Sequence, residues 1–435
     1  SYARSWIRDG AMISEGLLRM GRSDAVRDYV QWYAPHQFDN GKVPCCVDDR
    51  GSDPVPENDS HGELIHNIAE YWRYTGDEAF LEQMWPHVLG AYQYMETLRA
   101  SERTEENRAR NPAFYGMMPA SISHEGYSAK PMHSYWDNFW ALRGYKDAAI
   151  IAERLGKLEA MAISAARDEF RDDLQASLLS AMAQHRIDYL PGSAELGDFD
   201  ATSTTIALAP GGEQGRLPQP QLNNTFERYW KEFEQRRDGK REWKDYTPYE
   251  WRNVAAFVRL GWRERAWEAS AFFFKDRSPH AWNQWAEVVS RTPRTPFFVG
   301  DLPHAWVASD FVRSALDMFA YTRDLDQSLV LAAGVPNRWL DGQGIAVRGL
   351  RTPQGQLGYR LQRQDRQLQL DIDAGLVLPP GGLVLPWPYP GEPGAATVNG
   401  EAAQWENGEL RIHAVPASVL VDVPAAQRRS GRRER

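Results

Sequence analysis

Residues 18–30 read L-R-M-G-R-S-D-A-V-R-D-Y-V and contain the local pattern that decides the fold. One amphipathic helical pattern ends at Arg19, Gly21 follows, and a second helical pattern begins within three residues. Glycine adopts the left-handed conformation that commonly closes a helix, and a basic residue favours the last turn. A connection this short forces the two helices to lie antiparallel, as an αα-hairpin.

Three further segments follow the same plan. Residues 72–76 (W-R-Y-T-G), 154–156 (R-L-G) and 259–261 (R-L-G) each close one helical pattern and lead at once into another. Helices are predicted at residues 4–20, 22–34, 61–75, 78–101, 134–154, 157–187, 200–209, 222–236, 248–260, 262–275 and 304–322. One more helix upstream would give the twelve of an (α/α)6 toroid, and the start S-Y-A-R-S-W, without Met, leads us to expect a longer precursor.

Two other helical architectures share these hairpins, namely an irregular helical domain and a superhelical repeat array. Long Gly- and Pro-rich interruptions favour the toroid, because its loops gather on one face and carry function. These interruptions lie at residues 37–60, 102–133, 188–199, 210–221 and 276–303.

The pattern changes after Trp339. Alternating apolar residues at 357–361, 368–372 and 410–412, with turn signals between them, predict a small antiparallel β-sandwich. We expect it to cap the helical domain, with carbohydrate binding as a sharper alternative. The predicted domains are an (α/α)6 catalytic domain at 1–335, the β-sandwich at 336–424 and a disordered basic tail at 425–435.

Composition narrows the class of ligand. The 435 residues are 25% charged and 42% hydrophobic, as in an ordinary globular protein. A net charge of −9 argues against nucleic acid and anionic membranes as partners and suits a neutral ligand. Seventeen Trp and eighteen Tyr exceed the needs of the core, so some of these rings are expected to line a cleft.

No cofactor or metal is expected. The ten His are scattered, and neither H-E-x-x-H nor paired Cys spacing occurs. The adjacent pair Cys45 and Cys46 cannot staple distant segments, so no disulfide framework is expected. Asp48, Asp49 and Asp53 lack the EF-hand spacing of a calcium loop. No nucleotide-binding glycine motif is present and no apolar run approaches the ~20 residues of a membrane span. The sequence leaves the oligomeric state and the localisation open. A periplasmic or secreted protein is expected if an upstream signal peptide has been removed.

Two acidic segments rich in aromatics point to sugar chemistry. Residues 121–143 place Glu125 on a loop that enters a helix containing Trp136 and Trp140, and residues 281–287 read A-W-N-Q-W-A-E. Cleavage of a glycosidic bond uses a pair of carboxyl groups, and flat aromatic rings carry the apolar faces of pyranoses. The two segments together therefore predict a glycoside hydrolase.

Short motifs resemble those of a known superfamily. W-I-R-D-G-A-M at residues 6–12 resembles the W-x-R-D helix of glucoamylases, and H-E-G-Y at 124–127, before an aromatic helix, looks like the acid loop of glucoamylases and maltose phosphorylases. A helical part followed by a short β-domain resembles α-L-rhamnosidases. Together these features resemble the six-hairpin glycosidases over about residues 1–325. The glucoamylase Glu-Glu pair and the phosphorylase Asp-Glu-Tyr-His string are absent, which leaves sugar and linkage open.

The resemblance implies a catalytic pair. Members of this superfamily mostly invert, with a protonated carboxyl as acid and a carboxylate as base. By helix order Glu125 is implied as the acid, an exposed loop Glu being the alternative, and Glu287 as the base. Asp301 is the rival base, although its place before Pro303 also suits a helix N-cap. Exo action is inferred from the family.

Other residues are predicted to hold the sugar. Arg8 and Asp9 resemble the pair that binds the terminal sugar in glucoamylase, the alternative being a surface ion pair. Asp137 is as well suited to a capping box with Ser134 as to substrate binding. Glu57, Asp59 and His61 are plausible subsite members and equally plausible caps. The predicted substrate-binding set is Trp6, Arg8, Asp9, Glu57, His61, Trp136, Asp137, Trp140, Trp282, Trp285, Asp301, His304 and Trp306.

Other functions remain open on the same residues. A sugar epimerase or polysaccharide lyase would abstract a proton with His or Tyr, and His124, His133 and His304 are available for that. A glycoside phosphorylase would need a basic pocket where Glu287 stands. An inactive sugar-binding protein would keep the aromatic cleft without turnover.

Overall fold

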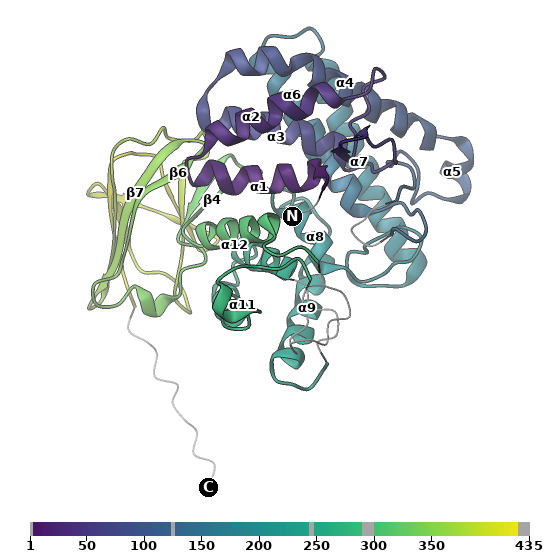
Figure 1. Ribbon diagram of the computed structural model, residues 1–435. Helices are drawn as coiled ribbons and strands as arrows, with labels where there is room; N and C mark the ends of the chain where they lie inside the picture. The colour runs from purple at the N-terminus through teal and green to yellow at the C-terminus, as the bar shows by residue number, and fades with distance from the viewer. Residues whose placement is uncertain (1–2, 123–126, 243–247, 289–299, 425–435) are drawn as a thin grey trace. The chain divides into compact units, whose positions relative to one another are not determined.

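The computed structural model describes residues 3–122, 127–242, 248–288 and 300–424. The chain divides into two compact units, Ser1–Leu316 and Asp317–Arg435. The first unit is helical and the second is built of strands (Figure 1). None of the described helices combines the length and the apolar character needed to cross a membrane.

Six helices form an inner ring in the first unit. They are α1 (Ile7–Arg19), α3 (Ser60–Thr75), α6 (Tyr135–Arg154), α8 (Ala201–Leu208), α10 (Arg252–Arg259) and α12 (Ala305–Asp317). Each packs against the next along the chain from α1 to α10. Polar contacts then close the ring through α12, where Ser309 donates to the carbonyl of Met12 in α1 at 2.5 Å and Asp310 pairs with Arg252 of α10 at 3.5 Å. The predicted (α/α)6 toroid is confirmed.

Outer helices cover this ring. They are α2 (Ser23–Tyr33), α4 (Glu78–Glu102), α7 (Ala160–His185), α9 (Gln221–Arg237) and α11 (Arg263–Lys275), with a short additional α5 (Glu105–Arg110). Each of the first five packs on the inner helix that precedes it in the chain. In the described part of the chain α12 has no outer partner after it, because the chain continues into strand β4 (Ala320–Arg323). The predicted helix 304–322 therefore ends at Asp317.

The four glycines that predicted the hairpins have the left-handed conformation expected at a helix end. Gly21, Gly76, Gly156 and Gly261 have φ values of 80°, 71°, 61° and 77°. At the first, the N–H of Gly21 bonds to Leu18 and that of Arg22 to Leu17. An L-residue in this left-handed region is strained, so these closures depend on glycine.

Two inner helices approach closely enough to require glycine at the contact. A Cβ on Gly62 of α3 would lie 2.0 Å from the carbonyl oxygen of Trp140 in α6, and one on Gly144 would lie 2.6 Å from the Cα of Gly62. This approach packs the first turn of α3 against the second and third turns of α6, and the indole of Trp136 at the start of α6 reaches Asp59 beside the start of α3.

A buried polar network lies inside the ring. His66 of α3 is 2.8 Å from Asp147 of α6 and 3.1 Å from Glu15 of α1, and Arg313 of α12 lies 2.9 Å from Glu15. Burial opposes ionisation of Glu15, but Arg313 and His66 outweigh it and lower its pKa to about 2. Each buried charge is paired, which is the condition under which such charges are tolerated.

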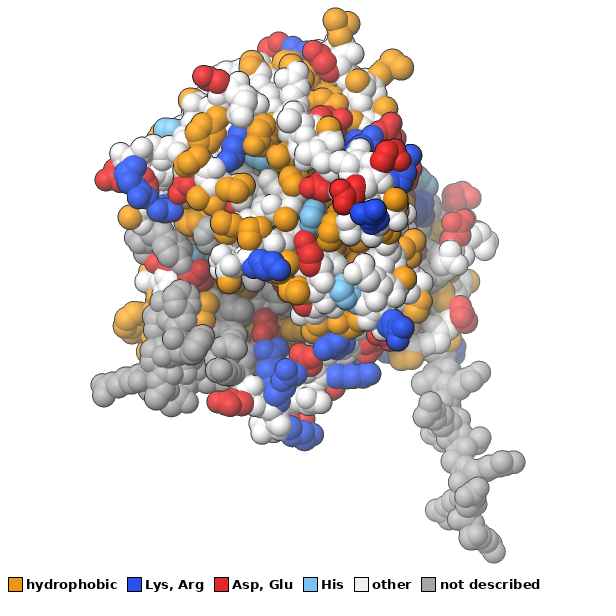
Figure 2. Space-filling view, turned by 90° about the vertical axis from the view of Figure 1, so that its right-hand side faces the viewer, with side chains coloured by type: hydrophobic (Ala, Val, Ile, Leu, Met, Phe, Trp, Pro, Cys, Tyr) orange, Lys and Arg blue, Asp and Glu red, His pale blue; other side chains and the backbone are white. Residues whose placement is uncertain are grey.

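The long connections lie at the end of the ring where the inner helices begin. The connections that enter inner helices span 34–59, 103–134, 186–200, 238–251 and 276–304, and those that leave them span 20–22, 76–77, 155–159, 209–220 and 260–262. Four of the five predicted interruptions lie at the entry end, and 210–221 lies at the other. The entry loops include strands β1 (Ser5–Trp6), β2 (Cys46–Asp48) and β3 (Gly51–Ser52) and the 3-10 turns η1 (Ala34–His36), η2 (Pro248–Trp251) and η3 (His280–Trp282). Figure 2 shows hydrophobic side chains among acidic and His side chains on the side of the molecule where α1 begins.

The second unit is a two-sheet sandwich. One sheet has the strand order β11-β10-β14-β8-β7-β6 and the other β12-β13-β9-β5-β4. The remaining strands are β5 (Ser328–Leu331), β6 (Ile345–Thr352), β7 (Gly355–Gln364), β8 (Gln367–Ile372), β9 (Leu383–Pro386), β10 (Ala396–Val398), β11 (Glu401–Ala403), β12 (Trp405–Glu406), β13 (Glu409–Ile412) and β14 (Ala417–Asp422), with a 3-10 turn η4 (Asn337–Trp339). Alternate strand residues fill a common hydrophobic core. The predicted small β-domain is confirmed, with one parallel pair, β5 with β9.

The unit boundary differs from the predicted one at residue 335. Strands β4 and β5 pair with each other, and β5 pairs with β9 of the sandwich. Residues 320–331 therefore belong to the second unit. In the sequence, Leu329 and Leu331 are equally compatible with the end of a helical region. Their strand β5 is assigned to the sheet by its pairing with β4 and β9.

Candidate active site

A buried group of side chains surrounds Arg8, in the first turn of α1. The Arg8 guanidinium donates to Asp59 at 2.8 Å and forms an ion pair with Glu57, and both carboxylates lie just before α3. The indole N–H of Trp136, at the start of α6, donates to the same oxygen of Asp59 at 2.8 Å. Arg8 is only 3% exposed, so the predicted alternative of a surface ion pair is wrong. We name Arg8, Glu57, Asp59, Glu63, Trp136 and Asp137 the Arg8 cluster.

The pKa values of the carboxyl groups in the Arg8 cluster shift in opposite directions. Burial opposes ionisation of Asp59, but Arg8 and Trp136 outweigh it and hold its pKa below the usual range. Burial, and the charge of Asp59 nearby, raise the pKa values of Asp137 and Glu63 well above the usual range. Both shifts favour the protonated form of Asp137 and Glu63, because one guanidinium cannot compensate every carboxylate around it.

Asp137 does not form the capping box that its spacing from Ser134 suggests. Ser134 makes no side-chain cap hydrogen bond to α6. The Asp137 carboxyl instead accepts from the hydroxyl of Ser121 at 2.5 Å, on the loop that carries Glu125. The side chain thus ties this loop to the first turn of α6.

A second group lies on the loop before α12. Backbone hydrogen bonds join Glu287 N to Asp301 O at 2.9 Å and His304 N to Trp285 O at 2.8 Å. The backbone N–H of Asp301 donates to the Glu287 carboxylate at 3.1 Å. A Cβ on Gly300 would lie 2.5 Å from Oε2 of Glu287, so glycine leaves the room that this carboxylate occupies.

Tyr249 connects the acids on this loop to a histidine. Its hydroxyl lies 2.9 Å from Nε2 of His304 and donates to Glu287 at 3.4 Å. His304 Nδ1 lies 3.6 Å from Asp301, and His304 Nε2 lies 3.8 Å from Asp9. We name Tyr249, Glu287, Asp301 and His304 the Glu287 cluster.

Burial dominates the electrostatics of the Glu287 cluster. It lowers the pKa of His304 to about 4, against the pull of Asp301, so the imidazole is neutral at neutral pH. Burial and the charge of Asp301 raise the pKa of Glu287 above its usual value, although the N–H of Asp301 opposes the shift. A carboxylate whose pKa moves toward neutrality is better matched to proton transfer. Asp301 is not an N-cap, because α12 begins only at Ala305.

Aromatic rings and one arginine join the two clusters. The Trp136 and Trp306 rings lie 6.1 Å apart, and Trp306 lies 4.5 Å from Tyr249. The Arg252 guanidinium, in the first turn of α10, lies 5.1 Å from the centroid of each of these three rings. The clusters therefore flank one cationic and aromatic centre at the entry end of the ring.

A hollow of about 310 Å³ adjoins this centre. Its polar end includes Trp6, Asp9, Asp301 and His304, and it continues along α1 past Ile13. Its volume is at the lower limit of small-molecule sites, enough for one sugar ring. Four predicted substrate-binding residues thus share one wall.

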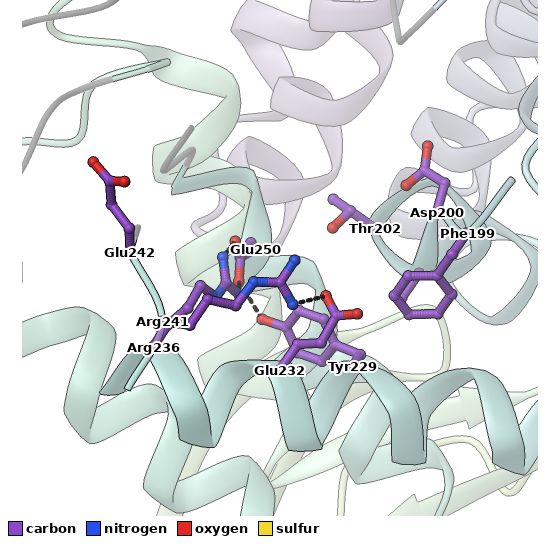
Figure 3. Close-up of a pocket in the computed structure, with 10 residues that line it drawn as sticks. Phe199, Asp200, Thr202, Tyr229, Glu232, Arg236, Arg241, Glu242 and Glu250 are labelled. Carbon is purple, nitrogen blue, oxygen red and sulfur yellow. Dashed lines mark hydrogen bonds and ion pairs between the residues drawn. The ribbon is translucent and has the colours of Figure 1, made fainter. Parts of the chain in front are cut away.

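A second hollow, of about 290 Å³, lies beside the start of α8 (Figure 3). Glu250 on its wall accepts from Tyr229 at 2.5 Å and from Arg236 at 2.7 Å, and Arg241 pairs with Glu232 at 3.2 Å. Its lining is mostly charged, with Phe199 as one apolar face.

Several solved structures are similar to this chain in fold. The α-L-rhamnosidase from Dictyoglumus thermophilum matches 96% of the chain with a TM-score of 0.60 and 11% identity, over 46% of its own length. The Streptomyces avermitilis α-L-rhamnosidase complexed with L-rhamnose matches 96% with a TM-score of 0.57 and 12% identity, over 38% of its length. A bacterial glucoamylase complexed with acarbose matches 72% with a TM-score of 0.50 and 13% identity, over 48% of its length.

The chain has the fold of the six-hairpin glycosidases. No family model matches the sequence, and the search of curated proteins found no match to it. The chain spans less than half the length of each of these three structures. At such low identity the likeness establishes the fold alone, and the reaction has to be argued from the site.

Within this six-hairpin fold, most of the predicted site residues lie in or beside the two clusters. They are Trp6, Arg8, Asp9, Glu57, Trp136, Asp137, Glu287, Asp301, His304 and Trp306. The predicted acid Glu125, like His124, lies outside the described residues.

Four predicted residues lie elsewhere. His61 accepts from the backbone of Val43 and packs on Tyr94, so it belongs to the core behind α3. Trp140 is fully buried beside His66. Trp285 packs on Trp251 as an anchor of its loop, and Trp282 is 61% exposed. On a helix or loop that bears several aromatics, spacing alone does not tell which ring faces the site.

Tyr249 and Arg252 were not among the site residues predicted from the sequence. Both stand in T-P-Y-E-W-R-N, where an aromatic, an arginine and a polar residue open an inner helix, as Trp6, Arg8 and Asp9 do at α1. That shared pattern is the signal from which they were predictable. His133, a predicted proton acceptor, is instead held 2.7 Å from Glu195 and 3.6 Å from Glu102, which raise its pKa to about 9 against the effect of burial.

Proposed function

We propose that this protein is a glycoside hydrolase that inverts configuration and removes terminal sugars. The observation that carries the proposal is the Glu287 cluster, a carboxylate with a raised pKa beside the aromatic centre of a six-hairpin glycosidase fold. The opposite side of that centre bears the Arg8 cluster, a set of buried hydrogen-bonding groups suited to sugar hydroxyls. Inversion also requires a protonated carboxyl on the other side of the sugar ring, and Glu125 is our proposed source of it.

In this proposal Glu287 is the general base. Its two oxygens receive the Asp301 N–H and the Tyr249 hydroxyl, which orient the carboxylate toward a water. Asp301 stands beside it and raises its pKa, so we assign Asp301 a tuning role and Glu287 the proton transfer. Glu125 stays our proposed proton donor, and its loop is tied to α6 through Ser121 and Asp137.

Sugar contact is proposed in the hollow beside the aromatic centre. Trp6 offers a ring face and Asp9 offers a carboxylate for hydroxyl groups at the polar end of this hollow. Rhamnosides and α-glucosides are the first substrates to test, because an α-L-rhamnosidase and a glucoamylase have the same fold. The substrate is a neutral oligosaccharide or polysaccharide in this proposal.

The test compares Glu287→Gln with Glu106→Gln in a screen of aryl glycosides and natural oligosaccharides. Glu287→Gln should lower kcat by about 10²–10⁴-fold, the usual value of general acid–base assistance. Glu106 is a solvent-exposed carboxylate of α5, so its variant should match the wild type. NMR of the first-formed anomer reports the stereochemistry. Turnover of Glu287→Gln within about tenfold of the wild type would refute the assignment.

A second function is supported by the Tyr249 and His304 pair. A hydroxyl 2.9 Å from a neutral imidazole is a suitable proton-abstracting pair, as a polysaccharide lyase or sugar epimerase needs. Product NMR separates the two proposals, because a lyase leaves an unsaturated sugar and an epimerase leaves the glycosidic bond intact. If the protein is a lyase or an epimerase, Tyr249→Phe should abolish turnover and Glu287→Gln should retain it.

A further inference from the structure

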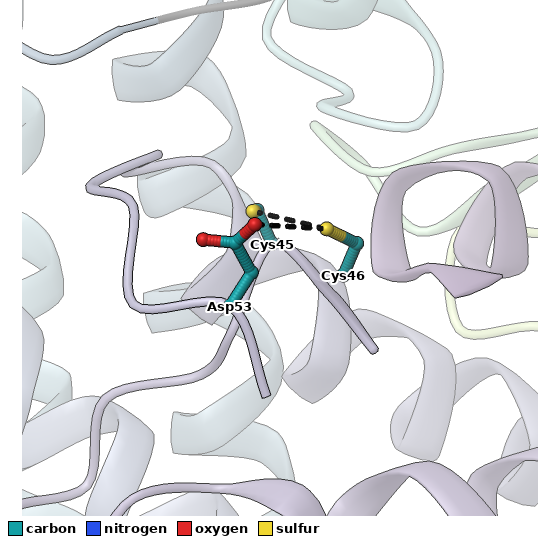
Figure 4. Close-up of side chains that lie close together, drawn as sticks. All are labelled: Cys45, Cys46 and Asp53. Atoms are coloured by element: carbon teal, nitrogen blue, oxygen red, sulfur yellow. Dashed lines mark hydrogen bonds between the residues drawn. The ribbon is translucent and has the colours of Figure 1, made fainter. Parts of the chain in front are cut away.

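Cys45, just before β2, and Cys46, the first residue of β2, lie against each other in the first unit. Both side chains are buried, and their Sγ atoms are 3.5 Å apart (Figure 4). Consecutive side chains of an extended strand point to opposite faces, so a contact between neighbouring thiols requires a local turn of the backbone. The chain therefore presents two sulfur atoms on one side.

A short hairpin brings a carboxylate to the same place. Strands β2 and β3 pair through Val47 with Ser52, and the backbone N–H of Asp53 donates to the carbonyl of Cys46 at 3.0 Å. The Asp53 carboxylate then lies 3.9 Å from Cys46 Sγ, and one ligand atom from each of the three residues lies within 4.8 Å of the others. Figure 4 shows Asp53 turned toward both sulfur atoms.

We propose that Cys45, Cys46 and Asp53 bind one thiophilic divalent cation, of which Zn²⁺ is the representative, with water as the fourth ligand. A tetrahedral site with Zn–S bonds of about 2.3 Å holds its sulfurs roughly 3.7 Å apart, close to the distance observed. Two sulfurs and one carboxylate favour zinc or cadmium over the oxygen-seeking calcium and magnesium. The sequence alone predicted no metal here, because paired Cys spacing is absent from it.

Arg4 supplies the charge balance of the site. Its guanidinium lies 3.1 Å from Asp53, 3.3 Å from Asp48 and 3.7 Å from Cys46. Two thiolates, Asp53 and Asp48 bring four negative charges, and Arg4 and Arg50, which both pair with Asp48, bring two positive charges, so a divalent cation makes this set neutral. The Arg4 side chain is 36% exposed and can leave Cys46 while it stays on Asp48.

The site is joined to the start of α1. Cys46 pairs with Trp6 across β1 and β2, and the N–H of Ile7 donates to the carbonyl of Cys45 at 3.1 Å. A cation held here binds the folded chain and not the unfolded one, so it raises the unfolding temperature.

The experiment titrates the reduced, chelator-treated full chain with Cd²⁺ and follows the ultraviolet thiolate-to-cadmium band. The band should saturate at one equivalent, be removed by Zn²⁺ in competition, and coincide with a rise in Tm. Cys46→Ser should lose about half of the band. Asp53→Asn should keep the band and weaken the affinity at least tenfold, because the carboxylate ligand is lost.

Asp49→Asn is the matched control, since Asp49 is an exposed carboxylate of the same hairpin, and it should behave as the wild type. Equal affinity in Asp53→Asn and Asp49→Asn would overturn the three-residue site. A chain that takes up no cadmium at one equivalent would overturn it too. So would a chain purified without reductant whose mass is lower by two hydrogen atoms and is restored by thiol, since that identifies a redox pair. If circular dichroism shows that Cys46→Ser does not fold, the comparison of Asp53→Asn with Asp49→Asn still tests the site.

Discussion

Asp59 and Glu287 are both carboxylates at the entry end of the inner ring, and their surroundings move their pKa values in opposite directions. Asp59 is buried and receives Arg8 and an indole N–H, which hold its pKa low. Glu287 is partly exposed and lies beside Asp301, and its pKa rises. A paired charge suits binding, and a carboxylate that can exchange a proton suits catalysis.

The largest effect is expected from removing the cation of the Arg8 cluster. Arg8→Met leaves Glu57 and Asp59 buried without their partner and should lower the free energy of unfolding by about 3–5 kcal/mol. Urea denaturation measures it. The double variant Arg8→Met with Asp59→Asn should recover part of the loss, since it removes one uncompensated charge. No recovery would mean that Asp59 is not the group that Arg8 neutralises.

The Glu287 cluster should respond in activity rather than in stability. Gly300→Ala places a Cβ against the Glu287 carboxylate and should displace it, with a loss of up to about 10²-fold in kcat/KM, the size expected for a misplacement of about 1 Å. The unfolding temperature should change little because the loop is partly exposed. An unchanged kcat/KM would show that the position of Glu287 is not critical.

Two histidines extend the comparison to pH. His133 has a folded pKa of about 9, above its usual value, so its contribution is complete below about pH 6.5 and is lost as the pH rises through 9. His304 has a folded pKa of about 4, below its usual value, so stability falls as the pH drops from about 6.5 toward 4.

Melting temperatures across pH test these two slopes separately. His133→Asn should flatten the alkaline fall, an effect on the order of 2 kcal/mol, and leave the acid fall unchanged. His304→Asn should do the reverse. Should both variants retain the wild-type profile, the slopes would belong to other groups, such as Glu15 at more acid pH.

The smallest effect is expected at Tyr249 if the protein is a hydrolase. Tyr249→Phe removes one hydrogen bond of 3.4 Å from Glu287 and should lower kcat by about threefold to tenfold, since a neutral hydrogen bond contributes about 1 kcal/mol. The acid limb of the pH–rate profile should move to higher pH, because a Glu287 oxygen that loses a hydrogen-bond donor is more basic. A loss as large as that of Glu287→Gln would favour the proton-abstracting alternative.

Much of the fold was predictable from local chemistry. Gly21, Gly76, Gly156 and Gly261 mark helix ends because only glycine takes the left-handed conformation without strain, and these ends set the hairpins and hence the ring. The end of α12 was not predictable, because the residues after Asp317 are compatible with helix or strand until β5 and β9 pair with them.

The site was predictable in part. Arg8, Trp136 and Glu287 stand in motifs that carry their chemistry, and the structure places them around one aromatic centre. His61 and Trp140 share those motifs but face the core, because the rotation of a helix about its axis is set by packing such as the Gly62 contact. Cys45 and Cys46 lacked a partner in sequence, since Asp53 reaches them only through the β2–β3 hairpin.

Residue order alone thus specified where helices stop, how they pair and which residue types open each inner helix, because backbone conformation and short connections are local. The charge state of each acid depended on the folded chain. Asp59, Asp137 and Glu287 are carboxyl groups with nearly the same intrinsic acidity, and a guanidinium, a buried neighbour or a second carboxylate brought close by distant segments makes them different.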